Sequence, residues 1–594
     1  MAHNIIIERD VMVPMRDGVR LATDVYRPDD GAKHPVLVNG HPYDNDHFLA
    51  MHELLFSPLV AAQRDYAVVV QEARGRAGSE GTWRPYGDEG RDAYDTVEWA
   101  AAQSWSDGNV GLYGACALGW AAIQGAVEAP PHLKSVFAYM TATNYHSGWT
   151  YSGGGAFELG FQLSWVWTIL ARDTISRLGL EPAAQKEAEL RLAEAASDVI
   201  GSARHLPLID FPAYQTGAAP YWREWLSHPG YDEFWQRVDA VARAERIKVP
   251  VLHMTAWYDT CLRGHMDLQS ALQLRGDEAV RDRHRLLIGP WDHSAYYNKR
   301  PTCAGERDFG PSVLTGPDVL AGIAFQWFDY WLRGTGDPFL PESKLRYFHM
   351  GENVWKEIDS WPPPHTIVPY YLHSAGQANS RRGDGVLSSE PPGTEPPDSY
   401  VYDPFDPVPT AGGRSMIDVL PGVENQAQVE ERQDVLVYTT PRLAEPVAIT
   451  GPLSVTLYAS SSAPDTDFTA KLVDVEPDGY CANIADGIVR ARYRNGCDRE
   501  EFLEPGKVTE FRIDLWDMAH TFQPNHRIRL EISSSNFPRF DRNLNSRVTP
   551  ALGGAADAQK AVQQVFHNPS HPSRLSLPVA SSTATPSRST SQTD

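Results

Sequence analysis

The most informative segment of the chain is Gly111-Leu-Tyr-Gly-Ala-Cys-Ala-Leu-Gly119. It predicts a short buried strand, a tight turn and the first turn of a helix that continues through the alanine-rich residues 120–127. Such a turn carries a reactive side chain on strained backbone, and its glycines leave room for that backbone. Helix N-terminal N–H groups also stabilise a thiolate and a developing oxyanion there. Cys116 is therefore the candidate nucleophile, and the alternative is a buried cysteine in an ordinary strand-to-helix turn.

Length and composition narrow the class of protein. The 594 residues exceed what one hydrophobic core supports, so about two to four domains are expected. A hydrophobic content of 42% with 17 Trp and 25 Tyr is typical of a well-packed globular protein. The net charge of −23 argues against a nucleic-acid partner, because phosphates require a basic surface.

No segment of the chain predicts export, membrane insertion or metal binding. Residues 1–10 lack the basic start and apolar core of a signal peptide, and no apolar run reaches the roughly 20 residues of a membrane span. The five cysteines are odd in number and widely spaced, which is untypical of a disulfide framework, and no CxxC or HExxH motif indicates zinc. No phosphate loop or dinucleotide motif is present either. We therefore expect a cytoplasmic protein with no membrane partner, no metal and no cofactor.

Alternating strands and helices predict a doubly wound α/β domain that is built from two parts of the chain. In the first part, residues 36–39 and 66–71 are Val-rich buried strands, and residues 88–103 form a helix. The pattern resumes at residues 249–255 and 284–289. The sequence between the two parts is rich in Ala, Glu and Leu, which predicts an inserted helical cap.

After residue 350 the sequence becomes rich in predicted strands and loses its long helices. Residues 453–459 and 528–533 alternate apolar and polar side chains, and residues 367–373 are a further candidate that Pro369 would confine to a sheet edge. Frequent Pro and Gly turns indicate a β-sandwich or jelly roll. The expected organisation is an α/β domain over 1–144 and 246–350, a helical cap over 145–245, a jelly roll over 351–575 and a disordered tail over 576–594.

Two later strand ends supply an acid and a base for Cys116. Asp259 follows one predicted strand and His293 follows the next. Active-site side chains of open α/β sheets gather at the carboxyl ends of the strands. The order nucleophile, acid, base, with the cap between the first two, is that of an α/β-hydrolase. Cys116, Asp259 and His293 are therefore the predicted catalytic residues.

Longer motifs make the chain similar to a known family. They include Met15-Arg-Asp-Gly-Val-Arg-Leu-Ala-Thr-Asp-Val-Tyr-Arg-Pro28, His41-Pro-Tyr43, Arg74-Gly-Arg-Ala-Gly-Ser-Glu-Gly81, Ala256-Trp-Tyr-Asp259 and Gly289-Pro-Trp-Asp-His293. Over residues 10–575 the chain resembles the cocaine esterase/X-prolyl dipeptidyl aminopeptidase family of hydrolases, which includes the α-amino acid ester hydrolases. The resemblance implies an α/β-hydrolase domain, a helical cap and a C-terminal jelly roll.

The resemblance also implies roles for single residues. Cys116 stands at the position of the family's nucleophilic serine, with Asp259 as triad acid and His293 as triad base. Tyr43 matches the tyrosine whose hydroxyl helps to form the oxyanion hole, and the backbone N–H of Ala117 would be the second donor. The family's turn is commonly Gly-x-Ser-Tyr-x-Gly. Here the serine has become cysteine, and the tyrosine after it has become alanine, which opens space beside the nucleophile.

Aromatic side chains crowd the beginning of the predicted cap. Ligand sites are largely apolar, so these side chains are candidates for a pocket wall, and cap core is the alternative. Cys261, two residues beyond Asp259, is expected near the site, either as a small buried residue or as a redox partner for Cys116. The candidate pocket residues are His41, Tyr145, Trp149, Tyr151, Phe157 and Trp165.

Three functions stay open at the level of sequence. The first is hydrolysis of an ester, thioester or reactive amide through an S-acyl-cysteine intermediate, which is the family default. The second is acyl transfer or cyclisation, as in natural-product biosynthesis, in which an amine or another non-water nucleophile takes the acyl group. The third is a non-catalytic binding protein, against which the intact Asp259, His293 and Tyr43 argue. The expected partner is a small-molecule acyl substrate, and the resemblance is compatible with a homo-oligomer.

Overall fold

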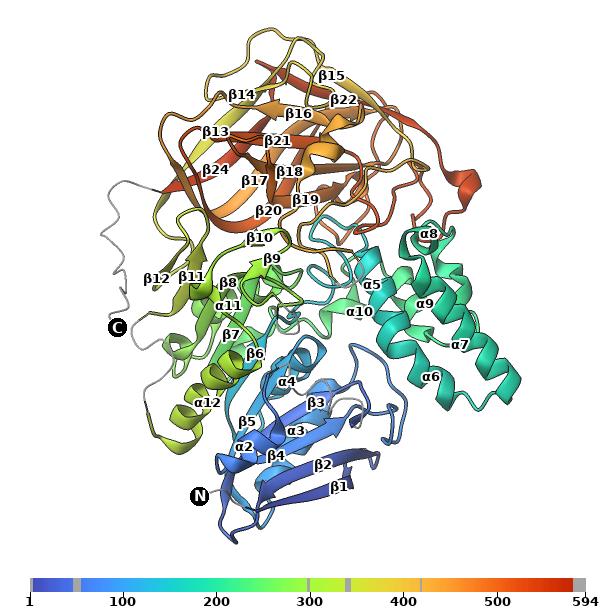
Figure 1. Cartoon of the computed structure of the whole chain (residues 1–594). Helices are drawn as coiled ribbons and strands as arrows, with labels where there is room; N and C mark the ends of the chain where they lie inside the picture. The colour runs from blue at the N-terminus through green and yellow to red at the C-terminus, as the bar shows by residue number, and fades with distance from the viewer. Residues whose placement is uncertain (1–3, 46–54, 296–299, 337–342, 417–418, 581–594) are drawn as a thin grey trace.

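A mostly parallel sheet forms the frame of the N-terminal half. The computed structural model describes residues 4–45, 55–295, 300–336, 343–416 and 419–580. Within these residues, ten strands form one sheet (Figure 1). Their spatial order is β1 (Ile5–Pro14), β2 (Arg20–Pro28), β4 (Ala67–Glu72), β3 (His34–His41), β5 (Ser106–Ala115), β6 (Leu133–Tyr139), β7 (Val251–Tyr258), β8 (Arg285–Asp292), β11 (Leu345–His349) and β12 (Val354–Ile358). Strands β4 to β11 of this order pair in parallel, and β1, β2 and β12 add antiparallel margins.

Helices cover both faces of this sheet, as parallel strands require. In β3, Val36 and Val38 belong to one hydrophobic core and Leu37 to another, because alternate residues of a strand face opposite sides. The first core lies under α3 (Glu89–Ala101), α4 (Ala117–Glu128) and α11 (Leu262–Arg275). Helices α2 (Pro58–Gln63) and α12 (Pro317–Arg333) pack into the second core.

A group of helices between β6 and β7 forms the cap, which projects to one side of the sheet in Figure 1. Proline at the first helical position begins two of these helices, where its fixed φ suits the turn. Buried tryptophans from this segment, Trp165, Trp222 and Trp225 among them, form its core. The cap helices are α5 (Leu159–Trp165), a π-helical turn (Val166–Leu170), α6 (Ala171–Arg177), α7 (Pro182–Ser197), α8 (Val199–Ala203), α9 (Pro220–Ser227) and α10 (Glu233–Gln236).

The C-terminal half is a β-structure that lies above the α/β half in Figure 1. Twelve strands of the described chain form it, nearly all of them antiparallel to their neighbours. Their order is β15 (Asp398–Tyr402), β22 (Ala561–Asn568), β17 (Val447–Ser461), β24 (Arg574–Ala580), β13 (His365–His373), β14 (Val386–Ser388), β16 (Leu436–Thr439), β21 (Arg527–Ser533), β18 (Asp467–Val475) and β19 (Cys481–Arg490). In addition, β20 (Thr509–Phe522) pairs with β17, and β23 (His571–Pro572) pairs with β22. A short hairpin of β9 (Cys303–Ala304) and β10 (Arg307–Asp308) follows β8.

The fold class predicted from the sequence is confirmed, with two corrections of detail. Strand β13 is not an edge strand, because it lies between β24 and β14. Pro369 is nevertheless tolerated there, since β14 pairs only with residues 371–373 and leaves Pro369 paired on the β24 side alone. Residues 576–580, assigned above to a disordered tail, lie in β24, whereas residues 581–594 lie outside the described residues.

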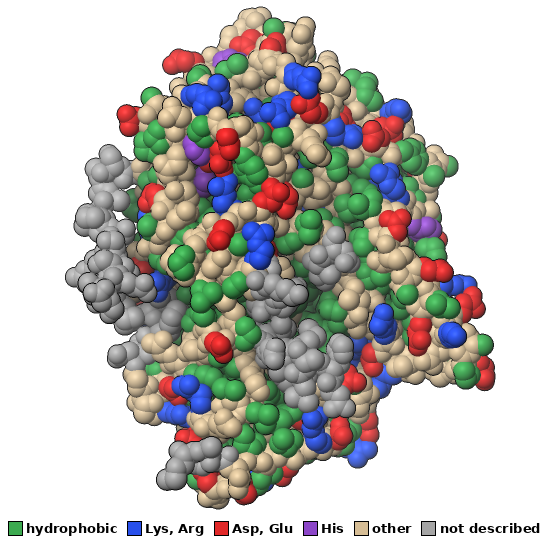
Figure 2. All heavy atoms as spheres, in the orientation of Figure 1, with side chains coloured by type: hydrophobic (Ala, Val, Ile, Leu, Met, Phe, Trp, Pro, Cys, Tyr) green, Lys and Arg blue, Asp and Glu red, His purple; other side chains and the backbone are tan. Residues whose placement is uncertain are grey.

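The surface carries both signs of charge. On the face shown in Figure 2, Lys and Arg side chains are interspersed with Asp and Glu over both halves. Among the described helices, none combines the length and the apolar character that a membrane crossing needs.

Candidate active site

Cys116 lies at the turn between β5 and α4, on strained backbone. Its φ of 54° and ψ of −125° fall where residues other than glycine are rarely found. Its backbone N–H donates to the carbonyl of Tyr139 over 3.0 Å. Its own carbonyl accepts from the hydroxyl of Thr141 over 2.6 Å and from the backbone N–H of Trp120 over 3.2 Å. Hydrogen bonds on both sides thus hold the strained turn in place.

Two glycines let α4 pass close to β5. A Cβ atom at Gly114 would lie 2.3 Å from the backbone carbon of Leu118, and one at Gly119 would lie 2.8 Å from Cβ of Thr141. Neither position can accept a side chain without moving the turn. The two glycines of the motif are therefore required by close approach.

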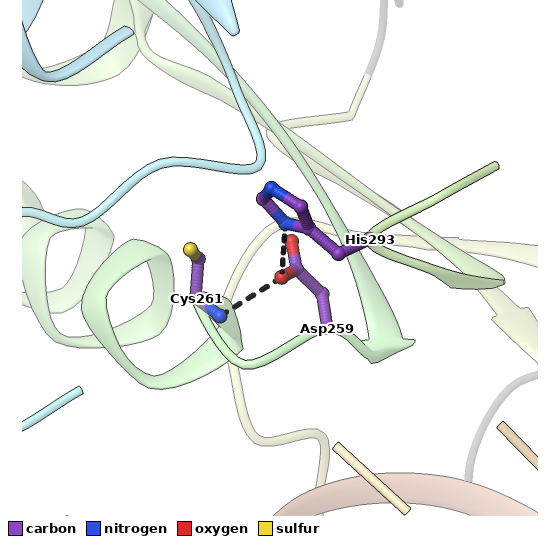
Figure 3. Close-up of side chains that lie close together, drawn as sticks. All are labelled: Asp259, Cys261 and His293. Carbon is purple, nitrogen blue, oxygen red and sulfur yellow. Dashed lines mark hydrogen bonds and ion pairs between the residues drawn. The ribbon is translucent and has the colours of Figure 1, made fainter. Parts of the chain in front are cut away.

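His293 and Asp259 form a buried pair just beyond β8 and β7 (Figure 3). His293 Nδ1 lies 2.9 Å from Asp259 Oδ1, and the side chains are 2% and 0% exposed. The same carboxylate oxygen accepts the backbone N–H of Cys261 over 2.9 Å. Burial alone would lower the pKa of His293, but the charges of Asp259 and Cys116, together with the hydrogen bond to Asp259, raise this pKa to about 10. The structure thus brings His293 and Asp259 together, with Cys116 near enough for its charge to act on the ring.

A second set of buried histidines supports the turn from behind. The backbone N–H of Thr141 donates to Nε2 of His265 over 2.9 Å, so the ring hydrogen of neutral His265 is on Nδ1. That nitrogen lies 3.2 Å from Nδ1 of His253 and donates to it. Burial lowers the pKa of His265 to about 4 and that of His253 further, which keeps both rings neutral at pH 7. Sequence reasoning missed this pair, since a strand residue and a helix residue twelve positions apart carry no motif.

The two predicted oxyanion donors follow adjacent strands. Tyr43 comes just after β3, and Ala117 is the first residue of α4, just after β5; β3 and β5 are parallel neighbours. The first N–H groups of a helix have no partner within the helix, so they are available to an anion. The Tyr43 segment is fixed from two sides: its N–H donates to Nδ1 of His41, and Arg76 Nε donates to the carbonyl of Pro42 over 2.7 Å.

A cavity of about 50 Å³ borders Ala117 and the cap. Three predicted pocket residues, His41, Tyr145 and Trp165, line it. Further lining residues that sequence reasoning missed include Trp83, Tyr86, Glu89 and Trp120. Burial raises the pKa of Glu89 to about 7. Its position in the first turn of α3 offered no signal of this, because an acidic residue there also serves the helix dipole.

The other three predicted pocket residues do not line this cavity within the described residues. Tyr151 donates its hydroxyl to the carbonyl of Trp225 over 2.9 Å. Phe157 packs edge-on against Trp222 with ring centroids 5.5 Å apart, and Trp149 packs edge-on against Trp165 at the same separation. They contribute to the packed core of the cap, which was the alternative interpretation of the aromatic run.

Comparison with known proteins gives the family. The model of X-Pro dipeptidyl-peptidase (S15 family) matches residues 17–295, and that of the X-Pro dipeptidyl-peptidase C-terminal non-catalytic domain matches residues 339–576. The cocaine esterase of Rhodococcus sp. (strain MB1 Bresler) is 37% identical over 582 residues, which cover 97% of this chain and 99% of that protein.

Two solved structures resemble the whole chain. An aminopeptidase from a marine sediment Thaumarchaeota archaeon has a TM-score of 0.78 at 25% identity. An α-amino acid ester hydrolase has a TM-score of 0.78 at 27% identity. Each match covers 98% of this chain and 97% of the other. With the α/β sheet, the cap, the β domain and the strand-end histidine and aspartate, these similarities establish that the chain belongs to the cocaine esterase/X-Pro dipeptidyl-peptidase (S15) family of hydrolases.

Proposed function

We propose that the protein is an acyl hydrolase in which Cys116 attacks an ester, a thioester or a reactive amide and forms an S-acyl-enzyme. Its family acts on esters or peptides, and the cysteine nucleophile is the step that we add. The observation that carries it is the strained turn of Cys116 beside the buried His293–Asp259 pair.

The first half of the reaction uses a thiolate–imidazolium pair. With a pKa of about 10, His293 holds its proton at neutral pH beside Cys116. The thiolate attacks the acyl carbon, and the hydroxyl of Tyr43 and the backbone N–H of Ala117 stabilise the oxyanion. His293 then gives its proton to the leaving group as the tetrahedral intermediate collapses to the thioester.

The second half uses the same histidine as a base. Acylation removes the charge of Cys116, which is one of the influences that raise the pKa of His293. The pKa of His293 therefore falls once the thioester has formed, and Nε2 takes a proton from an attacking water. Collapse of the second tetrahedral intermediate releases the acid and restores the thiolate and the imidazolium. Asp259 keeps the ring in the orientation that both halves need.

Acyl transfer is the second candidate, and the surroundings of Cys116 favour it. Ala117, the residue after Cys116, borders a cavity with aromatic walls, and His293 is almost fully buried. A thioester reacts well with amines relative to water, so an amine that reaches such a site would take the acyl group. The two reactions share the acyl-enzyme and differ only in what consumes it.

Mass spectrometry of the intact protein tests both candidates. The native protein is incubated with a panel of simple esters and thioesters beside Cys116→Ala, and Cys497→Ala, which changes another partly exposed cysteine, is the control. We expect an acyl adduct on the native protein and on Cys497→Ala, and none on Cys116→Ala. Decay of the adduct with and without added amine then separates hydrolysis from transfer. An adduct that persists in Cys116→Ala would contradict the proposal.

A further inference from the structure

Cys261 brings a second sulfur to the candidate site. It lies at the start of α11, is fully buried, and its thiol has no part in the mechanism above. Its Sγ, one ring nitrogen of His293 and one carboxylate oxygen of Asp259 lie within 4.8 Å of one another. Figure 3 shows the sulfur of Cys261 and the ring of His293 bordering the same space.

These atoms form a donor set that suits a thiophilic metal ion. Zinc binds sulfur at about 2.3 Å and imidazole nitrogen at about 2.0–2.1 Å, so ligands of one ion lie somewhat closer together than the 4.8 Å limit met here. Small side-chain rotations would therefore close the site. Sulfur and imidazole donors favour zinc over magnesium or calcium, which prefer oxygen.

Asp259 supplies the third donor. One of its carboxylate oxygens belongs to the same set as the sulfur of Cys261 and a ring nitrogen of His293, and its Oδ1 accepts the backbone N–H of Cys261 over 2.9 Å. All three side chains are buried. One thiolate, one imidazole and one carboxylate oxygen then leave the fourth position open to water.

A bound dication would also change the state of Cys261. A thiol gives up its proton when it coordinates a metal ion, because the charge of the ion stabilises the thiolate.

We propose that Cys261, His293 and Asp259 form a site for a thiophilic divalent cation such as Zn²⁺, and that its occupation stops the acyl chemistry. Binding releases one proton from the imidazolium of His293 and one from the thiol of Cys261, while Asp259 binds as the carboxylate. The ion takes a ring nitrogen of His293 and the carboxylate that orients the ring, so this acid–base pair cannot serve Cys116 while the ion is bound. The inhibition rests on the proposed function, whereas binding of the ion does not.

Direct binding to the full-length protein tests the site without any substrate. Zn²⁺ is titrated in competition with a chromophoric chelator, and Co²⁺ is used to detect thiolate-to-metal charge-transfer absorption. We expect one equivalent to bind the native protein, with weakening by at least roughly 100-fold in Cys261→Ser, since loss of an outer partner alone costs 10- to 100-fold. The matched control is Cys481→Ser, which changes a buried cysteine of strand β19 and should bind as the native protein does.

Inhibition is measured as a ratio to the metal-free rate of each variant. Zn²⁺ should abolish ester turnover by the native protein and by Cys481→Ser, a chelator should restore it, and Cys261→Ser should resist the same concentration. Equal binding by native protein and Cys261→Ser would overturn the proposal, as would no binding at one equivalent. A native protein that binds the ion through Cys261 and has no acyl activity would leave the site standing and refute the proposed function instead.

Discussion

Two histidine–carboxylate clusters can be compared within this molecule. The first is His293 with Asp259 beside Cys116 in the α/β half. The second lies in the β half, where Ser374 Oγ is 3.2 Å from Nε2 of His567 and Nδ1 of His567 is 3.0 Å from a carboxylate oxygen of Glu395. By distance alone, this second cluster has the arrangement of a serine–histidine–acid triad.

The clusters differ in what else their members bind. Ser374 Oγ also donates to Asp398 over 2.7 Å and accepts the backbone N–H of Gly376 over 2.9 Å. Nε2 of the fully buried His567 also contacts Asp398, at 2.9 Å. Cys116, in contrast, stands partly exposed on a turn with φ of 54°. Distances between three residue types are therefore not enough to identify an active site. The candidate site differs from the second cluster in the strained turn and the partial exposure of Cys116.

The largest expected effect separates the thiol of Cys116 from the hydroxyl of Ser374. Cys116→Ala should lower kcat/KM for an activated ester by about 10⁴-fold or more, because it removes the group that forms the acyl-enzyme. Ser374→Ala should leave kcat/KM unchanged, since that hydroxyl only joins β-strands. Steady-state turnover of both variants checks this, and a Ser374→Ala protein with native stability and little activity would contradict the comparison.

Substitutions of Asp259 and Asp398 should differ in their effect on activity and agree in their effect on stability. Asp259→Asn is expected to lower kcat by about 10³- to 10⁴-fold and also to lower the free energy of unfolding, because the buried ring of His293 loses both its orientation and its charged partner. Asp398→Asn is expected to keep kcat and to lower the free energy of unfolding by about 3 kcal/mol, because it leaves His567 buried beside a weaker partner. Urea denaturation and ester turnover are measured on both. Loss of activity in Asp398→Asn at a temperature where it is folded would show that the clusters are coupled.

The pH dependence of Cys116 alkylation sharpens the comparison at the level of charge. Because the pKa of His293 is raised to about 10, its ring stays protonated between pH 6.5 and 9, and this charge beside Cys116 should favour alkylation by iodoacetamide at the acid end of the range. His293→Gln removes the charge, so alkylation at pH 6.5 should be slower than in the native protein by on the order of 10- to 100-fold, with a smaller difference at pH 9. His567→Gln is the control and should keep the native profile. Identical profiles for native protein and His293→Gln would refute the ion pair.

The smallest expected effect concerns the support of the turn. Thr141→Val removes the 2.6 Å hydrogen bond to the carbonyl of Cys116 and should lower kcat by up to about tenfold, with KM unchanged. Thr141→Ser keeps the hydroxyl and should restore most of the rate. If Thr141→Val keeps the native rate and Thr141→Ser is slow, the side chain acts through packing of its methyl group against Gly119 instead.

The sequence predicts best what depends on short segments. The turn at Cys116 and the places of Asp259 and His293 after strands follow from local glycines and from strand-end geometry. The sequence could not predict which aromatic side chains of the cap border the cavity. Phe157 packs on Trp222 and Trp165 lines the cavity, and this difference is set by helices that are distant in the sequence. The catalytic roles of Cys116, Asp259 and His293 and the binding roles of the aromatic side chains stay predictions.

Long-range packing explains the other differences. His253 and His265 meet only because α11 folds back on β7, so no spacing rule marks them. The position of β13 inside its sheet depends on β24, about 200 residues later in the chain. Proline indicates an edge because it lacks an N–H, and Pro369 is indeed paired on one side alone, although β14 pairs with the residues that follow it.

The place of β24 has a consequence for the order of events during synthesis. Among the described strands, β17 and β13 are joined through β24 alone, so the middle of that sheet is missing until residue 580 has left the ribosome. The α/β sheet, in contrast, is complete in sequence once β12 ends at residue 358, roughly 10–45 s earlier at 5–20 residues per second. The half that carries Cys116, Asp259 and His293 can thus assemble on the ribosome while its neighbour still has two open strand edges. Those unpaired edges are the part of the nascent chain that can pair with another chain.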